Sequence, residues 1–533
     1  MLLELKIMKN FIAAFIVSFL SPCIMGYITI ATPLGPWIAP ILALSLIGFY
    51  KYQKHDALLP VAAGSLGGII ATAFGFSFPT LYFLDQAEFA LLMSSPLKCV
   101  YFIARLTFFG GAFGLLLARI IRKSMLDNKE LTFPIGQLIY NTIGLDEQTG
   151  QKKQLFWGFF SAIVYGFAQM RSWFLSIRLI PESFQLISKT IVTTSMGEFL
   201  IPSVRFNLGI IPMLASIGFI AGAMITVPLL IGAVAQIAVL EPLYVLVFNY
   251  LKRPDFVFAV SSGLVLSSAL SGIIGVPKQL YDFFKKQTVK NNLLDFSKIN
   301  FIQIVLLIGA FMLFLFEAGF SLVSQIYLMI TALLCAYQIV HIAGKIGLAL
   351  LGRFATFVMV PGLLLFGFNA LQITILAIFV ELVGGVATDA LFSYKAAQMA
   401  DVHEDKVYNF QVFGLVVSSL AMGLTIWFLC TYFQFGSEQL FAQRAQARAL
   451  LIQINTFDFY AIGVGMLFGY LLKFMKINPF FVLGGLLMPL SLSLPLIVGG
   501  AVALVVKKKE QYESFASGVY AANALTMILS VLL

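Results

Sequence analysis

The strongest constraint in the sequence is a nearly unbroken succession of apolar segments, each about long enough to cross a lipid bilayer. A helix needs about 20 apolar residues to span the hydrocarbon core, and such segments recur with only short connectors between them. Only 11% of the residues are charged, whereas soluble proteins carry about 25%. The sequence therefore predicts an all-α, polytopic integral membrane protein with roughly 14 to 17 membrane segments, some of them broken or re-entrant.

Several other classes of protein are excluded by the same pattern. An outer-membrane barrel would show alternating segments of about 10 residues between polar turns. The net charge is +10, but the basic residues lie in short connectors rather than along one soluble face, so no nucleic-acid partner is expected. His403-Glu404-Asp405 lacks the second histidine of a zinc helix. The four cysteines lie scattered through apolar segments without paired spacing, so we expect neither a metal site nor a cofactor.

The distribution of charge in the connectors predicts the orientation. Lys6 and Lys9 precede the first apolar run, and the connector at 79–96 contains acidic residues but neither Lys nor Arg. Short cytoplasmic loops collect Lys and Arg, so we expect a cytoplasmic N-terminus, with a first helix that is retained rather than cleaved. We expect one transmembrane domain over 1–533, with the basic connector near 278–298 as a possible boundary between halves. The expected location is a bacterial inner membrane.

Proline and glycine interrupt several apolar segments where a simple anchor would be continuous. The interruptions occur at 76–79, 131–136 and 484–495. Proline removes an amide donor and clashes with the preceding turn, and unpaired backbone is tolerated at membrane depth only when protein or a wet cavity surrounds it. Each interruption alone is compatible with a simple kink. Together they favour the broken helices that form the central sites of transporters.

The interrupted segments also carry a family resemblance. Leu131-Thr132-Phe133-Pro134-Ile135-Gly136 is similar to a leucine-proline-phenylalanine-proline-x-glycine signature, and the stretch from Pro489 to Gly500 is the most specific match. Further similar stretches lie at 62–82 and 207–222. In order and spacing, the chain resembles the oligopeptide transporter (OPT) family, which includes the yellow-stripe-like metal-chelate transporters, and its prokaryotic branch most of all. The resemblance implies transport without cofactor chemistry.

The sequence also departs from the family pattern. The family's aspartate-leucine-lysine-threonine-glycine-tyrosine segment corresponds to Asp389 through Tyr394, with Leu391 at the position of the lysine. Thr132 stands at the first proline of the signature, and the family's asparagine-proline-x-serine-glycine element has no clear counterpart. The resemblance therefore implies a transport role but does not identify the ligand.

Carboxylates within apolar segments are the first candidates for chemistry, because charge at membrane depth is costly. Glu317 interrupts a run of Phe, Leu and Met, with no charge near it in the sequence. Glu381 and Asp389 are eight residues apart, close to two helical turns, and so would share a helix face. We expect these three residues to couple transport to protons, with structural hydrogen bonding as the alternative.

Candidate substrate contacts lie mainly in the motif segments. Arg171 lies inside an apolar segment and offers a planar fork for a substrate carboxylate. A peptide or chelate also needs hydrogen-bonding groups and apolar walls, although each such residue is compatible with plain packing. The expected substrate-binding residues are Phe133, Pro134, Gly136, Arg171, Tyr394, Ser491 and Pro495.

These observations favour a secondary active, proton-coupled transporter of short peptides or peptide-like compounds over other classes. A metal-chelate or siderophore transporter of the same family is the alternative. No phosphate-binding GxxxxGK[ST] loop is visible. An intramembrane enzyme would need a nucleophile–base pair or paired metal ligands, and a channel would show charge rings or a filter sequence. Neither pattern is present in the sequence, so we expect no enzyme activity and, as partners, a small substrate, protons and the lipid bilayer.

Overall fold

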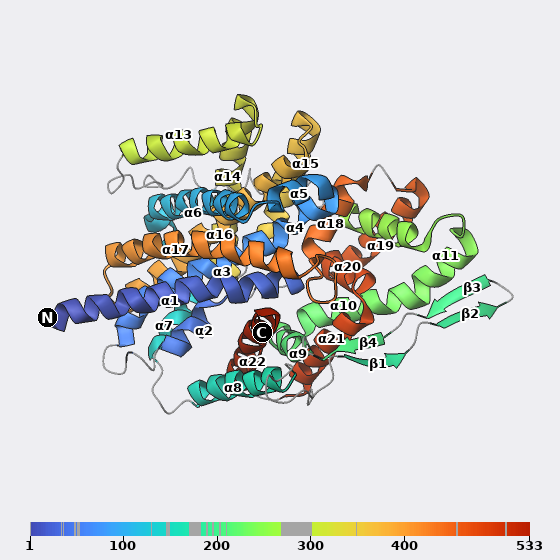
Figure 1. Ribbon diagram of the computed structural model, residues 1–533, viewed down its shortest axis with the longest axis horizontal. Helices are drawn as coiled ribbons and strands as arrows, with labels where there is room; N and C mark the ends of the chain where they lie inside the picture. The colour runs from blue at the N-terminus through green and yellow to red at the C-terminus, as the bar shows by residue number, and fades with distance from the viewer. Residues whose placement is uncertain are drawn as a thin grey trace. The chain divides into compact units, whose positions relative to one another are not determined.

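The computed structural model in Figure 1 describes most of the chain, and the account below concerns those residues. They are residues 2–32, 35, 37–46, 50, 54–128, 131–144, 150–169, 183–187, 190–194, 197–201, 204–208, 211–267, 301–347, 349–454, 457–506 and 509–532. Arg171 and the connector 278–298 lie outside this set.

The fold is all-α and polytopic, as the sequence predicts. Over the described residues, seven helices are long and apolar enough to cross a bilayer, and five shorter apolar helices accompany them. The larger count of 14 to 17 segments stays a prediction, because long stretches such as 268–300 lie outside the described residues. The chain divides into two compact units, each assembled from several stretches of sequence.

Unit 1 comprises Met1–Thr29, Gly35–Asp146 and Gly272–Thr431. Its centre is formed by α3 (Leu58–Ser77), whose residues are all buried, and α16 (Ala370–Met399), which is buried along most of its length. The long helices around them are α1 (Leu2–Ala31), α6 (Pro96–Leu126), α14 (Leu322–Ile346), α15 (Leu351–Phe366) and α17 (Glu404–Tyr432). The shorter helices are α2 (Ala39–Leu46), α4 (Pro79–Leu84), α5 (Gln86–Met93), α7 (Pro134–Gly144), α13 (Phe301–Glu317) and the turn η2 (Lys54–Ala57).

Local signals set the ends of the central helices. Asn369 caps α16 with its side chain, and Gln372 returns a side-chain bond to the backbone of Asn369, which completes a capping box. The α14 helix starts at the Ser321 cap and ends at Gly347, which adopts the left-handed conformation that glycine tolerates best. Within unit 1, α16 packs against α3, α6, α14 and α15. Local sequence thus sets where α16 begins and where α14 begins and ends.

Unit 2 comprises Ile30–Leu34, Glu147–Ser271 and Tyr432–Leu533. Three helix pairs dominate it: α8 with α22, α9 with α21, and α10 with α20. Its helices are α8 (Gln151–Gln169), α9 (Ile211–Ala221), α10 (Ala223–Ala235), η4 (Gln236–Leu240), α11 (Glu241–Val247), a helix over 253–267, α18 (Gln443–Ile452), α19 (Phe459–Phe474), α20 (Pro479–Leu487), α21 (Leu490–Val505) and α22 (Lys509–Leu532).

Reciprocal glycine contacts join the helix pairs of unit 2. A Cβ on Gly218 of α9 would lie 2.0 Å from the Leu496 carbonyl oxygen of α21, and one on Gly499 would lie 2.0 Å from the Ala215 oxygen of α9. Small residues let helix backbones approach in membranes, where lipid tails leave little hydrophobic drive for association. The same reciprocal arrangement recurs at Gly232 and Gly485, at Gly263 and Gly465, and at Gly158 and Gly518.

Unit 2 also contains four short strands between α8 and α9. β1 (Ser183–Ile187) pairs antiparallel with β4 (Val204–Asn207), and β2 (Thr190–Thr194) pairs antiparallel with β3 (Gly197–Ile201). The β-branched and aromatic residues of these strands, such as Ile191, Val192 and Phe199, suit strands better than a helix.

The three predicted interruptions have different outcomes. Helical geometry continues through Phe78, so α3 and α4 form a single span from Leu58 to Leu84, and the expected break is only one residue long. Pro79 has no amide proton for the Gly75 carbonyl, but Phe78 keeps helical backbone angles (φ −61°, ψ −43°), so the span remains continuous. Real breaks occur before Pro134 of α7 and at Pro489, which is extended between α20 and α21. A further break occurs at Gly222 (φ 64°) between α9 and α10.

Candidate functional site

Two buried carboxyl groups lie between the central helices of unit 1. The Ser65 hydroxyl of α3 donates to Asp389 Oδ2 of α16 at 2.6 Å, and the Ser77 hydroxyl donates to Glu381 Oε2 at 2.5 Å. Asp389 is 1% exposed and Glu381 is fully buried. Both carboxyl groups meet α3, so they lie on one face of α16, as their spacing predicts.

A serine is a suitable partner for a carboxyl group that changes its protonation state. Its hydroxyl can donate to a carboxylate or accept from a protonated carboxyl, so the contact can persist in both states. Transfer of a charged carboxylate out of water costs several kcal/mol, and one hydroxyl bond offsets only part of that cost. The Ser65–Asp389 pair is therefore chemically equipped to hold and release a proton, and the Ser77–Glu381 contact joins the same two kinds of group.

Glu317 lies in a different setting, at the last residue of α13. Its Oε2 accepts from Arg105 Nη1 of α6 at 2.6 Å, and its side chain is 60% exposed within the chain. The Arg105 guanidinium also lies over the rings of Tyr101 and Phe314. The sequence shows no charge close to Glu317, and its partner is 212 residues away, so local pattern cannot identify the pair.

The motif residues at the start of α7 pack against the C-terminal part of α16, which also carries Asp389. Phe133 is fully buried, and its amide donates to the Gly344 carbonyl at 2.8 Å. Pro134 begins α7, and a Cβ on Gly136 would lie 2.7 Å from the Phe392 carbonyl oxygen. Tyr394 of α16 is buried near Arg122. The structure thus brings Phe133, Gly136 and the Asp389–Tyr394 segment of α16 close together.

In unit 2 the break between α20 and α21 gathers polar side chains. Ser491, in the first turn of α21, lies 3.1 Å from Glu438 Oε1, and Pro495 is buried one turn further along. The α21 amino terminus favours negative charge through its dipole. Gln443 is buried against α20, and a Cβ on Gly484 would lie 2.5 Å from its amide nitrogen.

The polar helix α18 was not among the residues singled out from the sequence. It begins Gln443-Arg444-Ala445-Gln446-Ala447-Arg448, and Arg448 is only 5% exposed. The signal was present, because this polar run stands between apolar segments and a buried arginine in a membrane protein is a functional candidate. Glu438 lies in the connector just before α18 and has no comparable sequence signal.

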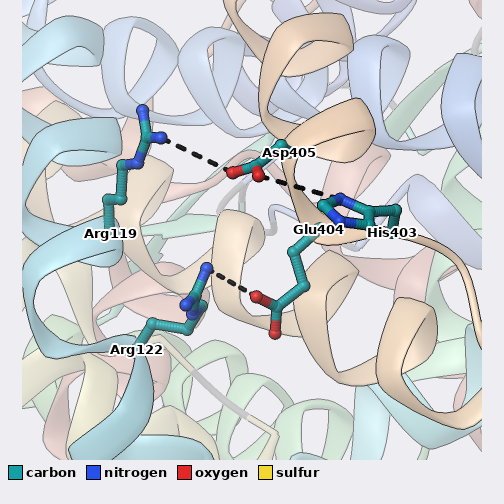
Figure 2. A network of polar contacts seen from close by, with 5 residues as sticks. All are labelled: Arg119, Arg122, His403, Glu404 and Asp405. Atoms are coloured by element: carbon teal, nitrogen blue, oxygen red, sulfur yellow. Dashed lines mark ion pairs between the residues drawn. The ribbon is translucent and has the colours of Figure 1, made fainter. Parts of the chain in front are cut away.

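A charged cluster lies at one end of unit 1, between α6 and the start of α17 (Figure 2). Arg122 Nη1 lies 2.6 Å from Glu404 Oε2, and Arg119 Nη2 lies 3.5 Å from Asp405 Oδ1. His403 Nδ1 lies 3.7 Å from the other oxygen of Asp405. The acidic residues occupy the first turn of α17, where the helix dipole also favours them.

Comparison with known proteins adds one positive finding. The family model described as OPT oligopeptide transporter protein matches residues 1–274. No curated protein matches the chain. The matched half includes the stretches at 62–82, 131–136 and 207–222, whereas the segments around Asp389 and Ser491 lie beyond it.

Proposed function

The chain belongs to the OPT oligopeptide transporter family, and from this premise we propose that it is a secondary, proton-coupled transporter of short peptides or peptide-like compounds. Proteins of this family are membrane transporters rather than enzymes. Many helices long and apolar enough to cross a membrane make this chain a multi-pass membrane protein. The proposal adds the coupling ion, the substrate class and the residues that serve each.

Proton coupling is supported chiefly by the Ser65–Asp389 pair. A proton-coupled carrier needs a group that is shielded from water in one state and that gains or loses a proton as the carrier changes state. Asp389 is almost completely buried beside a hydroxyl that can serve either protonation state. Glu381 and Ser77 form a second group of the same kind. Glu317 is a third candidate, in which protonation would release Arg105.

Substrate binding is assigned to the interrupted segments. In unit 2, the α21 amino terminus, Ser491, Pro495 and the polar helix α18 with Arg448 offer donors and a positive charge for a peptide carboxylate. In unit 1, Phe133, Pro134 and Gly136 pack against the C-terminal part of α16 that carries Phe392 and Tyr394, and this packed wall is the candidate contact there. Arg171 stays a candidate from sequence alone.

A metal-chelate substrate is the alternative within the same family. The described residues contain no cluster of three or more His, Cys, Asp or Glu side chains suited to hold a metal. We further propose a bacterial inner membrane as the location, with the N-terminus on the cytoplasmic side, because basic residues at the ends of spans, such as Lys6 and Lys9 in α1 and Arg119 and Arg122 near the end of α6, favour that side.

The test is uptake of labelled di- to tetrapeptides, and of a metal chelate, into proteoliposomes under an imposed pH gradient. We expect gradient-driven uptake of peptide by the wild type, a strong loss in D389N and E381Q, and persistent substrate exchange in both variants. D401N is the matched control, since Asp401 is exposed and asparagine tolerates its left-handed backbone (φ 55°). Equal uptake with the gradient collapsed would remove proton coupling from the proposal.

A further inference from the structure

We propose that the Arg122–Glu404 and Arg119–Asp405 pairs are a positioning device that holds α16 at the axial position where Asp389 meets Ser65. The inference rests on the proposed proton coupling and adds residues that act on Asp389 without touching it. It is carried by the charged cluster in Figure 2, the contacts of its arginines, and the packing of α6 on α16.

The arginines of the cluster are held more firmly than ordinary surface pairs. The side chains of Arg122 and Arg119 are 11% and 20% exposed, and fully exposed ion pairs contribute little because water screens them. Each guanidinium also lies near an aromatic ring: Arg119 over Tyr408 at 4.2 Å and Arg122 near Tyr394 at 6.0 Å. Tyr394 belongs to α16, so Arg122 contacts both helices that the turn joins.

The connection from the cluster to α16 is short. Only residues 400–403 separate α16 from α17. Within that turn the Ala400 amide donates to Ala396 and the Val402 amide donates to Ala397. The carboxylates of Glu404 and Asp405 follow at once, so a movement of the α17 start along α6 must move the end of α16 as well.

Away from this end, the contact between α6 and α16 is apolar: Leu382 and Val386 of α16 lie against Gly110 and Gly114 of α6, and Phe379 lies against Phe113. Apolar attraction is non-directional, whereas an ion pair fixes the positions of two particular groups. One residue of helical rise is about 1.5 Å, whereas the favourable range of an O–H···O bond spans only about 0.5 Å. A slip of one residue would therefore break the 2.6 Å bond between Ser65 and Asp389. We infer that the arginine pairs prevent this slip.

The test measures the register of α16 directly. In a background with the four native cysteines replaced by alanine, I69C and G385C form a reporter, since a Cβ at position 385 would lie 2.8 Å from the Ile69 side chain. We expect R122Q and E404Q each to slow oxidative cross-linking of this pair about tenfold, the effect of losing a charged hydrogen bond. R122K should restore much of the rate. K406Q, which removes the same charge from an exposed residue in the first turn of α17, should leave it unchanged.

Gradient-driven peptide uptake is measured on the same substitutions in the wild-type background, and the two readouts separate the two proposals. Slower cross-linking together with weaker gradient dependence supports both. Slower cross-linking with unchanged gradient dependence supports the positioning role and counts against Asp389 as the coupling group. Unchanged cross-linking in both R122Q and E404Q, with the proteins still monodisperse in detergent, overturns the positioning role whatever the uptake shows. Equal slowing in K406Q overturns it too, because the effect would then be one of general charge.

Discussion

The glycine contact between α9 and α21 allows a quantitative test of how unit 2 is held together. In G218A the new Cβ would lie 2.0 Å from the Leu496 carbonyl oxygen and 2.8 Å from its carbonyl carbon. Real Cβ atoms essentially never come within 3.0 Å of another heavy atom, and the obstacle here is backbone that cannot rotate away. The two helices must therefore separate by about 1 Å, since extra methyl groups in a packed interface force backbone shifts.

Such overpacking costs about 1–3 kcal/mol. A domain of 150–250 residues loses about 2–4 °C of melting temperature per kcal/mol, so G218A should lower the melting temperature of the detergent-solubilised protein by several degrees. Fluorescence-detected size-exclusion chromatography after heating measures this shift. G499A, on the other side of the contact, should act similarly, and the double variant should lose less than the sum, because the first substitution already separates the helices.

G463A is the matched control for this prediction. Gly463 lies inside α19, and a Cβ there would meet no atom within 4 Å. Alanine should be neutral or stabilising by up to about 1 kcal/mol, because it has the better helix propensity. A G218A protein that melts no lower than G463A would refute close backbone packing as the basis of the α9–α21 contact.

Three further predictions concern other parts of the molecule. Burial raises the pKa of Glu88, on α5 between two spans; the Leu371 backbone opposes that shift and Asp85 adds to it. The folded state therefore binds this proton more tightly than the unfolded state, and stability falls as pH rises above the ordinary pKa of a glutamate. E88Q should raise the melting temperature at pH 7 but not at pH 4. A rise at both pH values would instead point to an effect on packing. Phe311 is fully buried against Phe109, Phe113 and Phe379. F311A should therefore lower the free energy of unfolding by about 3–5 kcal/mol and lower the melting temperature. F316A, at a position that is 73% exposed, should have little effect on the melting temperature. Glu438 should compete with a substrate carboxylate for Ser491, so E438Q should lower the half-saturating concentration for a free peptide and not for its C-terminal amide; an equal change for both would contradict a carboxylate site there.

Local pattern was enough to predict part of the candidate site. The eight-residue spacing of Glu381 and Asp389 predicts a shared helix face, and both side chains meet serines of α3, because helical periodicity depends only on neighbouring residues. The break at Pro489 follows equally from local chemistry. By contrast, Pro79 leaves α3 and α4 in one continuous span, because Phe78 keeps helical backbone angles despite the loss of one amide donor.

The sequence by itself determined the class of the protein: the length and apolarity of its segments require a helical membrane protein, because lipid leaves backbone groups no partners outside a helix or a closed barrel. Only the tertiary structure decided which polar and charged side chains meet. Arg105 reaches Glu317 across 212 residues, Ser491 meets Glu438 across 53, and the arginines of α6 meet the first turn of α17. These pairings depend on how distant helices pack, and a helix specifies the direction of its side chains without specifying which neighbour will lie there.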